Sequence, residues 1–165
     1  MADPSHPRPD FQALVGHYTG TSRVYFRPDE LADATTIEGE ITVADQGRFL
    51  QFAYSSTVQG KQADGVLLLA YDSALGQFLM TWRDTFHNGE RLLHLTSERG
   101  LAADLWQASG LYPADETTDW GWRIEVLPQG EGQLQVQHFN LPPFLPEGAL
   151  GVDWQLRRVA PPPHL

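Results

Sequence analysis

Short runs of aromatic and aliphatic residues recur along most of this chain, and turn residues separate them. Residues 47–54, 65–72 and 76–82 are examples, each beginning at a glycine. Runs of this length, bounded by Gly, Asp, Asn and Pro, predict β-strands, and many strands at regular spacing predict an antiparallel sandwich or barrel. The pattern contains almost no helical periodicity, so we predict an all-β fold.

The turn signals divide the chain into ten predicted strands. Asn88-Gly89 is the clearest hairpin signal, because both residues suit the positive φ of a tight turn. Asp10 is predicted to cap a short helix over 11–15, and the segment 110–119 is predicted to be a long polar loop. These features predict an antiparallel up-and-down β-barrel of about ten strands, closed at one end by a short N-terminal helix. The predicted strands are 17–26, 35–44, 48–58, 63–71, 77–83, 91–97, 101–108, 120–127, 133–139 and 152–159.

The chain is predicted to form one barrel domain over 1–165, with a flexible arm at 1–9 and a flexible tail at 160–165. Hydrophobic residues make up 41% of it, enough for a core, so it is not a disordered acidic segment. The net charge of −10 argues against binding to nucleic acid or to an anionic membrane surface. The chain has no cysteine, no long apolar stretch and no secretory signal, so we expect a cytoplasmic protein.

The first and last predicted strands carry a pairing motif. Gly16 precedes Tyr18 by two residues, which lets backbone pack closely beneath the ring, and Arg157 and Arg158 lie in the last strand. The first and last strands of a closed barrel are neighbours, so one guanidinium is predicted to lie on the Tyr18 ring as a cation–π contact.

This pattern is similar to the calycin superfamily of lipocalins and fatty-acid-binding proteins, whose first strand carries Gly-x-Trp beneath an arginine of the last strand. The chain most closely resembles bacterial lipocalin-like domains of unknown function, in Gly16-x-Tyr18-x-Gly20, in 65–72 and in 82–87. The resemblance implies a calycin-like barrel and structural roles for Gly16, Tyr18 and an arginine, for which we choose Arg157. It implies no activity.

The segment 82–87 is the densest polar cluster, and it precedes the Asn88-Gly89 turn at the predicted barrel rim. Asp84 and His87 form a candidate acid–base pair, in which the carboxylate orients the imidazole. The alternative is that both side chains only satisfy backbone groups of the turn.

The predicted interior is rich in aromatic rings. Trp120 and Trp122 share one face of the strand 120–127 and are predicted to point inward, whereas strand 48–58 leaves open whether Phe52 and Tyr54 or Phe49 do. An apolar pocket with a few polar groups is typical of ligand sites. The candidate ligand-binding residues are Arg23, Phe52, Tyr54, Met80, Trp82, His87, His94, Trp106, Trp122 and His138.

No metal site is predicted, because no two histidines have the spacing of a helical metal site and nothing requires His87, His94 and His138 to converge. Haem remains an alternative cofactor. Nitrobindin, a barrel of similar size, binds haem through one histidine; residues 154–158 contain none, and His138 is the nearest candidate ligand.

The sequence therefore predicts a barrel that binds a small apolar or amphipathic molecule. The alternatives are a small barrel enzyme that uses Asp84 and His87, and a haem carrier. Homodimerisation through an outer face is left open, with Leu67 and Leu92 as outward candidates.

Overall fold

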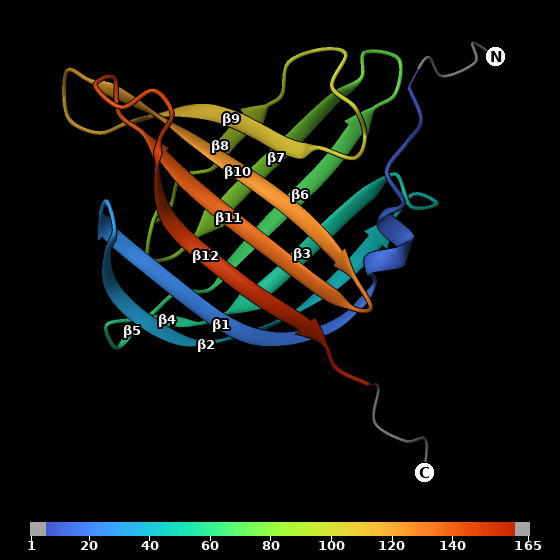
Figure 1. Cartoon of the computed structure of the whole chain (residues 1–165), viewed down its shortest axis with the longest axis horizontal. Helices are drawn as coiled ribbons and strands as arrows, with labels where there is room; N and C mark the ends of the chain where they lie inside the picture. The colour runs from blue at the N-terminus through green and yellow to red at the C-terminus, as the bar shows by residue number, and fades with distance from the viewer. Residues whose placement is uncertain (1–5, 161–165) are drawn as a thin grey trace.

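The computed structural model describes residues 6–160 of the chain. Within them, ten antiparallel strands close into a barrel (Figure 1). This confirms the predicted all-β barrel. The barrel strands are β1 (Gly16–Arg27), β2 (Glu30–Ala44), β3 (Phe49–Ser55), β6 (Gly65–Asp72), β7 (Gln77–Asp84), β8 (Leu93–Thr96), β9 (Trp106–Pro113), β10 (Asp119–Gly130), β11 (Gln133–Leu141) and β12 (Ala149–Arg158).

Neighbours in the chain are neighbours in the barrel. The only interruption in the described residues is the small hairpin of β4 (Thr57–Val58) and β5 (Lys61–Gln62), which lies outside the barrel sheet, so β3 pairs with β6. The predicted strand 48–58 covered both β3 and β4, because the alternation of residue types did not reveal the break between them. Pairing of β1 with β12 closes the sheet, which leaves no free edge.

Strict alternation decides which side chains face inward. On β3 the buried residues are Leu50, Phe52 and Tyr54, whereas Phe49 is half exposed on the outside. On β6 the buried set includes Leu67, and its neighbour Leu68 faces solvent. Leu67 is therefore a core residue and not the outward contact that the sequence suggested for a dimer.

One end of the barrel is closed by a 3-10 turn, η1 (Phe11–Leu14), and not by the predicted short helix over 11–15. Asp10 caps this turn as predicted, since its carboxylate accepts a hydrogen bond from the backbone N–H of Ala13 at 3.2 Å. Phe11 packs edge-on against Trp106, with ring centroids 5.3 Å apart. Four residues are enough to cover this end, because two buried apolar side chains anchor the turn and the chain enters β1 directly afterwards.

The arginine on the Tyr18 ring is Arg158, not Arg157. Tyr18 is the register partner of Arg158, whose guanidinium lies 5.7 Å from the ring centroid and donates to the Tyr18 hydroxyl at 3.1 Å. Arg157, one residue earlier, faces solvent. Gly16 has a φ of +149°, and a Cβ there would lie 3.1 Å from Cδ of Arg158. Gly16 thus makes room for the Arg158 stem, whereas the sequence predicted close backbone packing beneath the Tyr18 ring.

The largest strand error concerns β9. The predicted strand 101–108 and loop 110–119 are replaced by a strand over Trp106–Pro113, so half of the expected loop is barrel wall. Gly110 in β9 has no side chain to block the approach of the His94 carbonyl, which lies 2.2 Å from where its Cβ would be. The pairing of β8 with β9 is limited to Thr96 and Ser109. Trp120, expected inside, is only partly buried and packs on Phe144.

Residues 1–5 of the predicted arm and 161–165 of the predicted tail lie outside the described residues. No helix within residues 6–160 has the length and apolar character needed to cross a membrane.

Candidate functional site

A pocket of about 440 Å³ opens at the barrel end opposite η1. Phe11 of η1 contacts Trp106 at the start of β9, whereas the pocket is lined by residues at the other end of that strand. In Figure 1, η1 and the C-terminal end of β9 lie on opposite sides of the barrel. The lining residues are Trp82, His87, Asn88, Arg91, Leu92, Leu93, Leu111, Tyr112, Pro113 and Trp122.

A row of three residues across β3, β6 and β7 places the polar groups beneath this pocket. Tyr54 is the register partner of Gly65, and Gly65 is the partner of Asp84. A Cβ on Gly65 would lie 2.2 Å from the Tyr54 hydroxyl oxygen, so the phenol crosses over the glycine to reach the third strand. The Tyr54 hydroxyl donates to Oδ2 of Asp84 at 2.6 Å.

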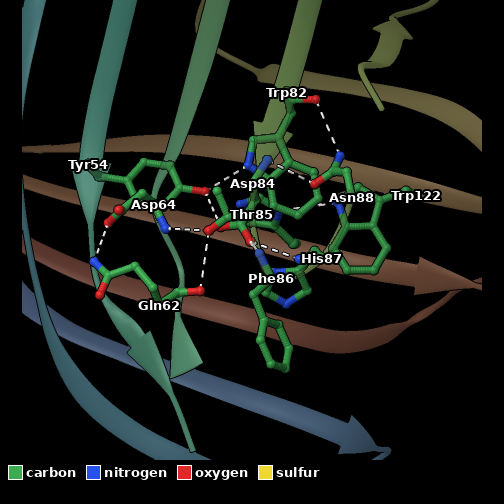
Figure 2. A network of polar contacts seen from close by, with 11 residues as sticks. Tyr54, Gln62, Asp64, Trp82, Asp84, Thr85, Phe86, His87, Asn88 and Trp122 are labelled. Carbon is green, nitrogen blue, oxygen red and sulfur yellow. Dashed lines mark hydrogen bonds and ion pairs between the residues drawn. The ribbon is translucent and has the colours of Figure 1, made fainter. Parts of the chain in front are cut away.

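Asp84 is almost completely buried and accepts four hydrogen bonds (Figure 2). Besides Tyr54, its donors are the backbone N–H groups of Phe86 and His87, at 2.8 and 2.9 Å, and Nδ1 of His87 at 3.0 Å. The carboxylate therefore serves the turn and orients the imidazole at once. The contacts expected under the two sequence-based interpretations of Asp84, to the backbone of the turn and to the imidazole, therefore occur together.

Hydrogen bonds keep Asp84 ionised despite its burial. Burial alone raises the pKa of a carboxyl. Here the hydrogen bonds from His87 and from the Tyr54 hydroxyl outweigh burial and lower the pKa of Asp84 from its ordinary value. The pKa of Tyr54 is raised well above its ordinary value, first by burial and then by the charge of Asp84. The Tyr54 hydroxyl thus remains protonated and donates to Asp84.

His87 carries the network to the pocket. Its side chain is 18% exposed against 2% for Asp84, and the ring lies between those of Phe86 and Trp122, at 5.0 and 6.2 Å between centroids. With Nδ1 donating to the ionised Asp84, the neutral ring has Nε2 as an acceptor. Nε2 has no hydrogen-bond partner among residues 6–160, and His87 lines the pocket.

His138 lies deeper, inside a cage of tryptophans. Its ring is fully buried, with centroids 4.5 Å from Trp82, 5.7 Å from Trp122 and 4.7 Å from Trp154. Nδ1 accepts from Nε1 of Trp122 at 3.1 Å, whereas Nε2 has no partner in the described chain. Burial, with a smaller contribution from His87, lowers the pKa of His138 to about 3. His138 is therefore neutral at ordinary pH and carries its proton on Nε2.

The surroundings of His138 do not fit a haem. A haem iron needs an open position in front of the histidine nitrogen and an apolar slot for the macrocycle. Nε2 of His138 is fully buried and three indole rings surround the imidazole. Within the described residues, no three His, Asp or Glu side chains lie close enough together to hold a metal ion. His94, considered as a third histidine, is on the outer face, where it contacts Thr81.

The predicted ligand-binding residues separate into three groups. Trp82, His87 and Trp122 line the pocket. Tyr54 and His138 lie behind this lining and hold it through hydrogen bonds. A third group lies elsewhere: Arg23 and His94 are exposed on the outer face, and Phe52, Met80 and Trp106 are core residues away from the pocket lining.

Tightly packed rings fill the barrel interior near its centre. Trp154 lies 4.4 Å from Tyr54 and 6.0 Å from Phe52 between centroids. A void lined by core residues such as Leu67 and Val136 measures only about 10 Å³, about the smallest volume that holds one water molecule. The space for a ligand is therefore at the mouth of the barrel and not in its middle.

Sequence reasoning named three of the ten residues that line the pocket and missed the other seven. Arg91 and Asn88 lie in the turn after β7, and Leu111 and Tyr112 lie in the segment predicted as a loop. The available signal was the spacing of two that relates residues 106, 108, 110 and 112, because it continues from the predicted strand into the predicted loop. Nothing in the turn itself indicated that Arg91 would line a pocket, because that placement depends on its distance from β9 and β10.

The sequence model of one protein family matches residues 3–143, most of the chain; the family is described as "Protein of unknown function (DUF1579)". No curated protein matches the chain.

Proposed function

We propose that this chain, which belongs to the DUF1579 family of proteins of unknown function, binds a small amphipathic molecule in the pocket at the open end of its barrel. The observation that carries the proposal is the pocket's composition. Two near-parallel indoles, those of Trp82 and Trp122, lie 5.4 Å apart and form an apolar wall. The pocket has a volume of about 440 Å³, which lies within the range of small-molecule sites. The resemblance to lipocalins supports the same proposal.

Exposed apolar side chains at the rim support an opening for an apolar ligand. Leu92 and Leu111 line the pocket while 56% and 70% exposed. Leucines are costly to leave in water, and a ligand that covers them recovers about 25 cal/mol per Å² of apolar surface. Both lie outside the packed core, so substitutions there are expected to spare the fold.

The neutral fluorescent probe N-phenylnaphthylamine tests this proposal. We expect saturable binding with energy transfer from tryptophan, and a fall in affinity of about five- to tenfold in Leu111→Ser, since one leucine contact is lost. Leu68→Ser, a leucine exposed on the outer face of β6, is the matched control and is expected to bind as the wild type does. Failure of the wild type to bind, or an equal loss in both variants, would contradict the proposal.

A second candidate function is acid–base catalysis on the bound molecule. The observation that favours it is the Asp84–His87 hydrogen bond of 3.0 Å, which orients the ring and leaves Nε2 as a free acceptor at the pocket. In ester hydrolysis, Nε2 would take a proton from the attacking water and return it to the departing oxygen. Such general base catalysis contributes about 10²–10⁴-fold.

Hydrolysis of para-nitrophenyl butyrate tests the second candidate. The wild type is expected to exceed the buffer rate by about 100-fold or more, and His87→Gln to lose this excess while still binding N-phenylnaphthylamine. His94→Gln, on the outer face, serves as control and should keep the activity. Equal rates in wild type and His87→Gln would rule out catalysis by His87.

A further inference from the structure

Most polar atoms that line the pocket are already bonded within its wall. Nε1 of Trp82 donates to the Tyr54 hydroxyl at 2.9 Å, and Nε1 of Trp122 donates to His138 at 3.1 Å. Both indole N–H groups therefore point away from the ligand space. A bound molecule meets the carbon surfaces of these rings and gains no hydrogen bond from them.

The amide of Asn88 and the phenol of Tyr112 also form hydrogen bonds within the wall. Oδ1 of Asn88 accepts from the backbone N–H of Asp84 at 3.0 Å, and its Nδ2 donates to the carbonyl of Trp82 at 3.3 Å. The Tyr112 hydroxyl donates to Asn140 at 2.7 Å. These bonds hold the wall in shape, and they leave few groups to recognise a polar ligand.

Two polar side chains remain available at the pocket, His87 through Nε2 and Arg91 through its guanidinium. Arg91 is exposed and makes no ion pair with any residue in 6–160. No Asp or Glu is among the described residues that line the pocket, and the buried charge of Asp84 is taken up by its four donors. The pocket thus offers one unpaired positive charge and no negative charge, in a chain with net charge −10.

We infer that the ligand is a flat, apolar monoanion, such as an aromatic carboxylate, with its anionic end on Arg91 and its ring against Trp82 and Trp122. This inference rests on the proposed function and names the class of molecule that the pocket takes. A guanidinium matches a carboxylate with two parallel hydrogen bonds. The acidic surface of the chain does not attract anions at long range, so selectivity for an anion comes from contact with Arg91.

Two probes of nearly equal shape, naphthoate and its neutral amide naphthamide, separate charge from apolar fit. Affinities are measured by tryptophan fluorescence and calorimetry on the full chain. We expect the wild type to bind naphthoate about 10- to 100-fold more tightly than naphthamide, because a charge-assisted hydrogen bond contributes a difference in affinity of about this size. Arg91→Met keeps an unbranched apolar stem but removes the guanidinium, and it is expected to remove this preference without weakening the binding of naphthamide. Arg99→Met, in the loop between β8 and β9 and outside the pocket lining, is the control and should keep it.

The outcomes distinguish this inference from the function on which it rests. Equal binding of the two probes by the wild type overturns the inference, and so does a preference that persists in Arg91→Met. In both cases binding in the pocket still stands. Binding of N-phenylnaphthylamine without binding of naphthoate also overturns the inference alone. If none of the three probes binds, the proposed function fails and the inference fails with it.

Discussion

Acidification from about pH 7 to pH 4.5 is expected to remove about 2.5 kcal/mol of folding stability through His138 alone. The folded pKa of His138 is about 3, below the 6.5 of an unconstrained histidine. Between these values the unfolded chain binds a proton that the native protein does not. Stability from this group is therefore fully present above about pH 6.5 and falls by about 1.4 kcal/mol per pH unit as the pH drops toward 3.

Urea denaturation of wild type and His138→Gln at both pH values measures this effect. Glutamine retains an acceptor for Nε1 of Trp122 but does not titrate, so the variant should lose about 2.5 kcal/mol less on acidification. The exposed His94, changed to Gln, is the matched control and should behave as the wild type does. The same pH dependence in His138→Gln and wild type would show that His138 titrates normally in the folded state. The window stays above pH 4 because the lowered pKa of Asp84 brings in a second loss of stability below it.

Replacement of Asp84 by alanine is expected to destabilise the protein by about 3–5 kcal/mol. The substitution leaves the Tyr54 hydroxyl, two backbone N–H groups and Nδ1 of His87 without their acceptor. Each buried donor left unpaired costs about 1–3 kcal/mol before the turn relaxes and water enters. Chemical denaturation gives the loss directly.

Two further variants qualify this result. Asp104→Ala removes an exposed carboxylate and should change stability by no more than about 0.5 kcal/mol. Asp84→Asn keeps one acceptor oxygen and is expected to lie between alanine and wild type. A loss below about 1 kcal/mol in Asp84→Ala would mean that water replaces the carboxylate at little cost, and that the network does not hold the turn.

Alternation of side chains identified the inner face of the barrel correctly where strands were regular. Trp122, Ile124 and Val126 on β10 point inward as expected, because a strand has a period of two and only one face is buried. The same rule applied to Asp84 places it inside, in line with Met80 and Trp82 on β7. A carboxylate at an inward position next to a turn was the strongest signal for the site.

The sequence could not decide features that depend on neighbouring strands. The choice of Arg158 over Arg157 depends on the register between β1 and β12, and a shift of one residue would have reversed it. The strand predicted over 101–108 ended too early, so Leu111 and Tyr112 were assigned to a loop. The reason is that a glycine such as Gly110 indicates a strand end when the neighbouring strand is unknown.

By itself, the sequence determined the all-β class and the closed antiparallel barrel, and it offered Asp84 and His87 as a candidate pair, because period, turn residues and short spacing are local properties. Only the tertiary structure decided that Tyr54 reaches Asp84 across Gly65 and that Arg91 lines the pocket. It also decided that the rings fill the barrel centre and leave space at its mouth. These outcomes depend on strand register and on how side chains from several strands share one volume, which no single segment of the chain specifies.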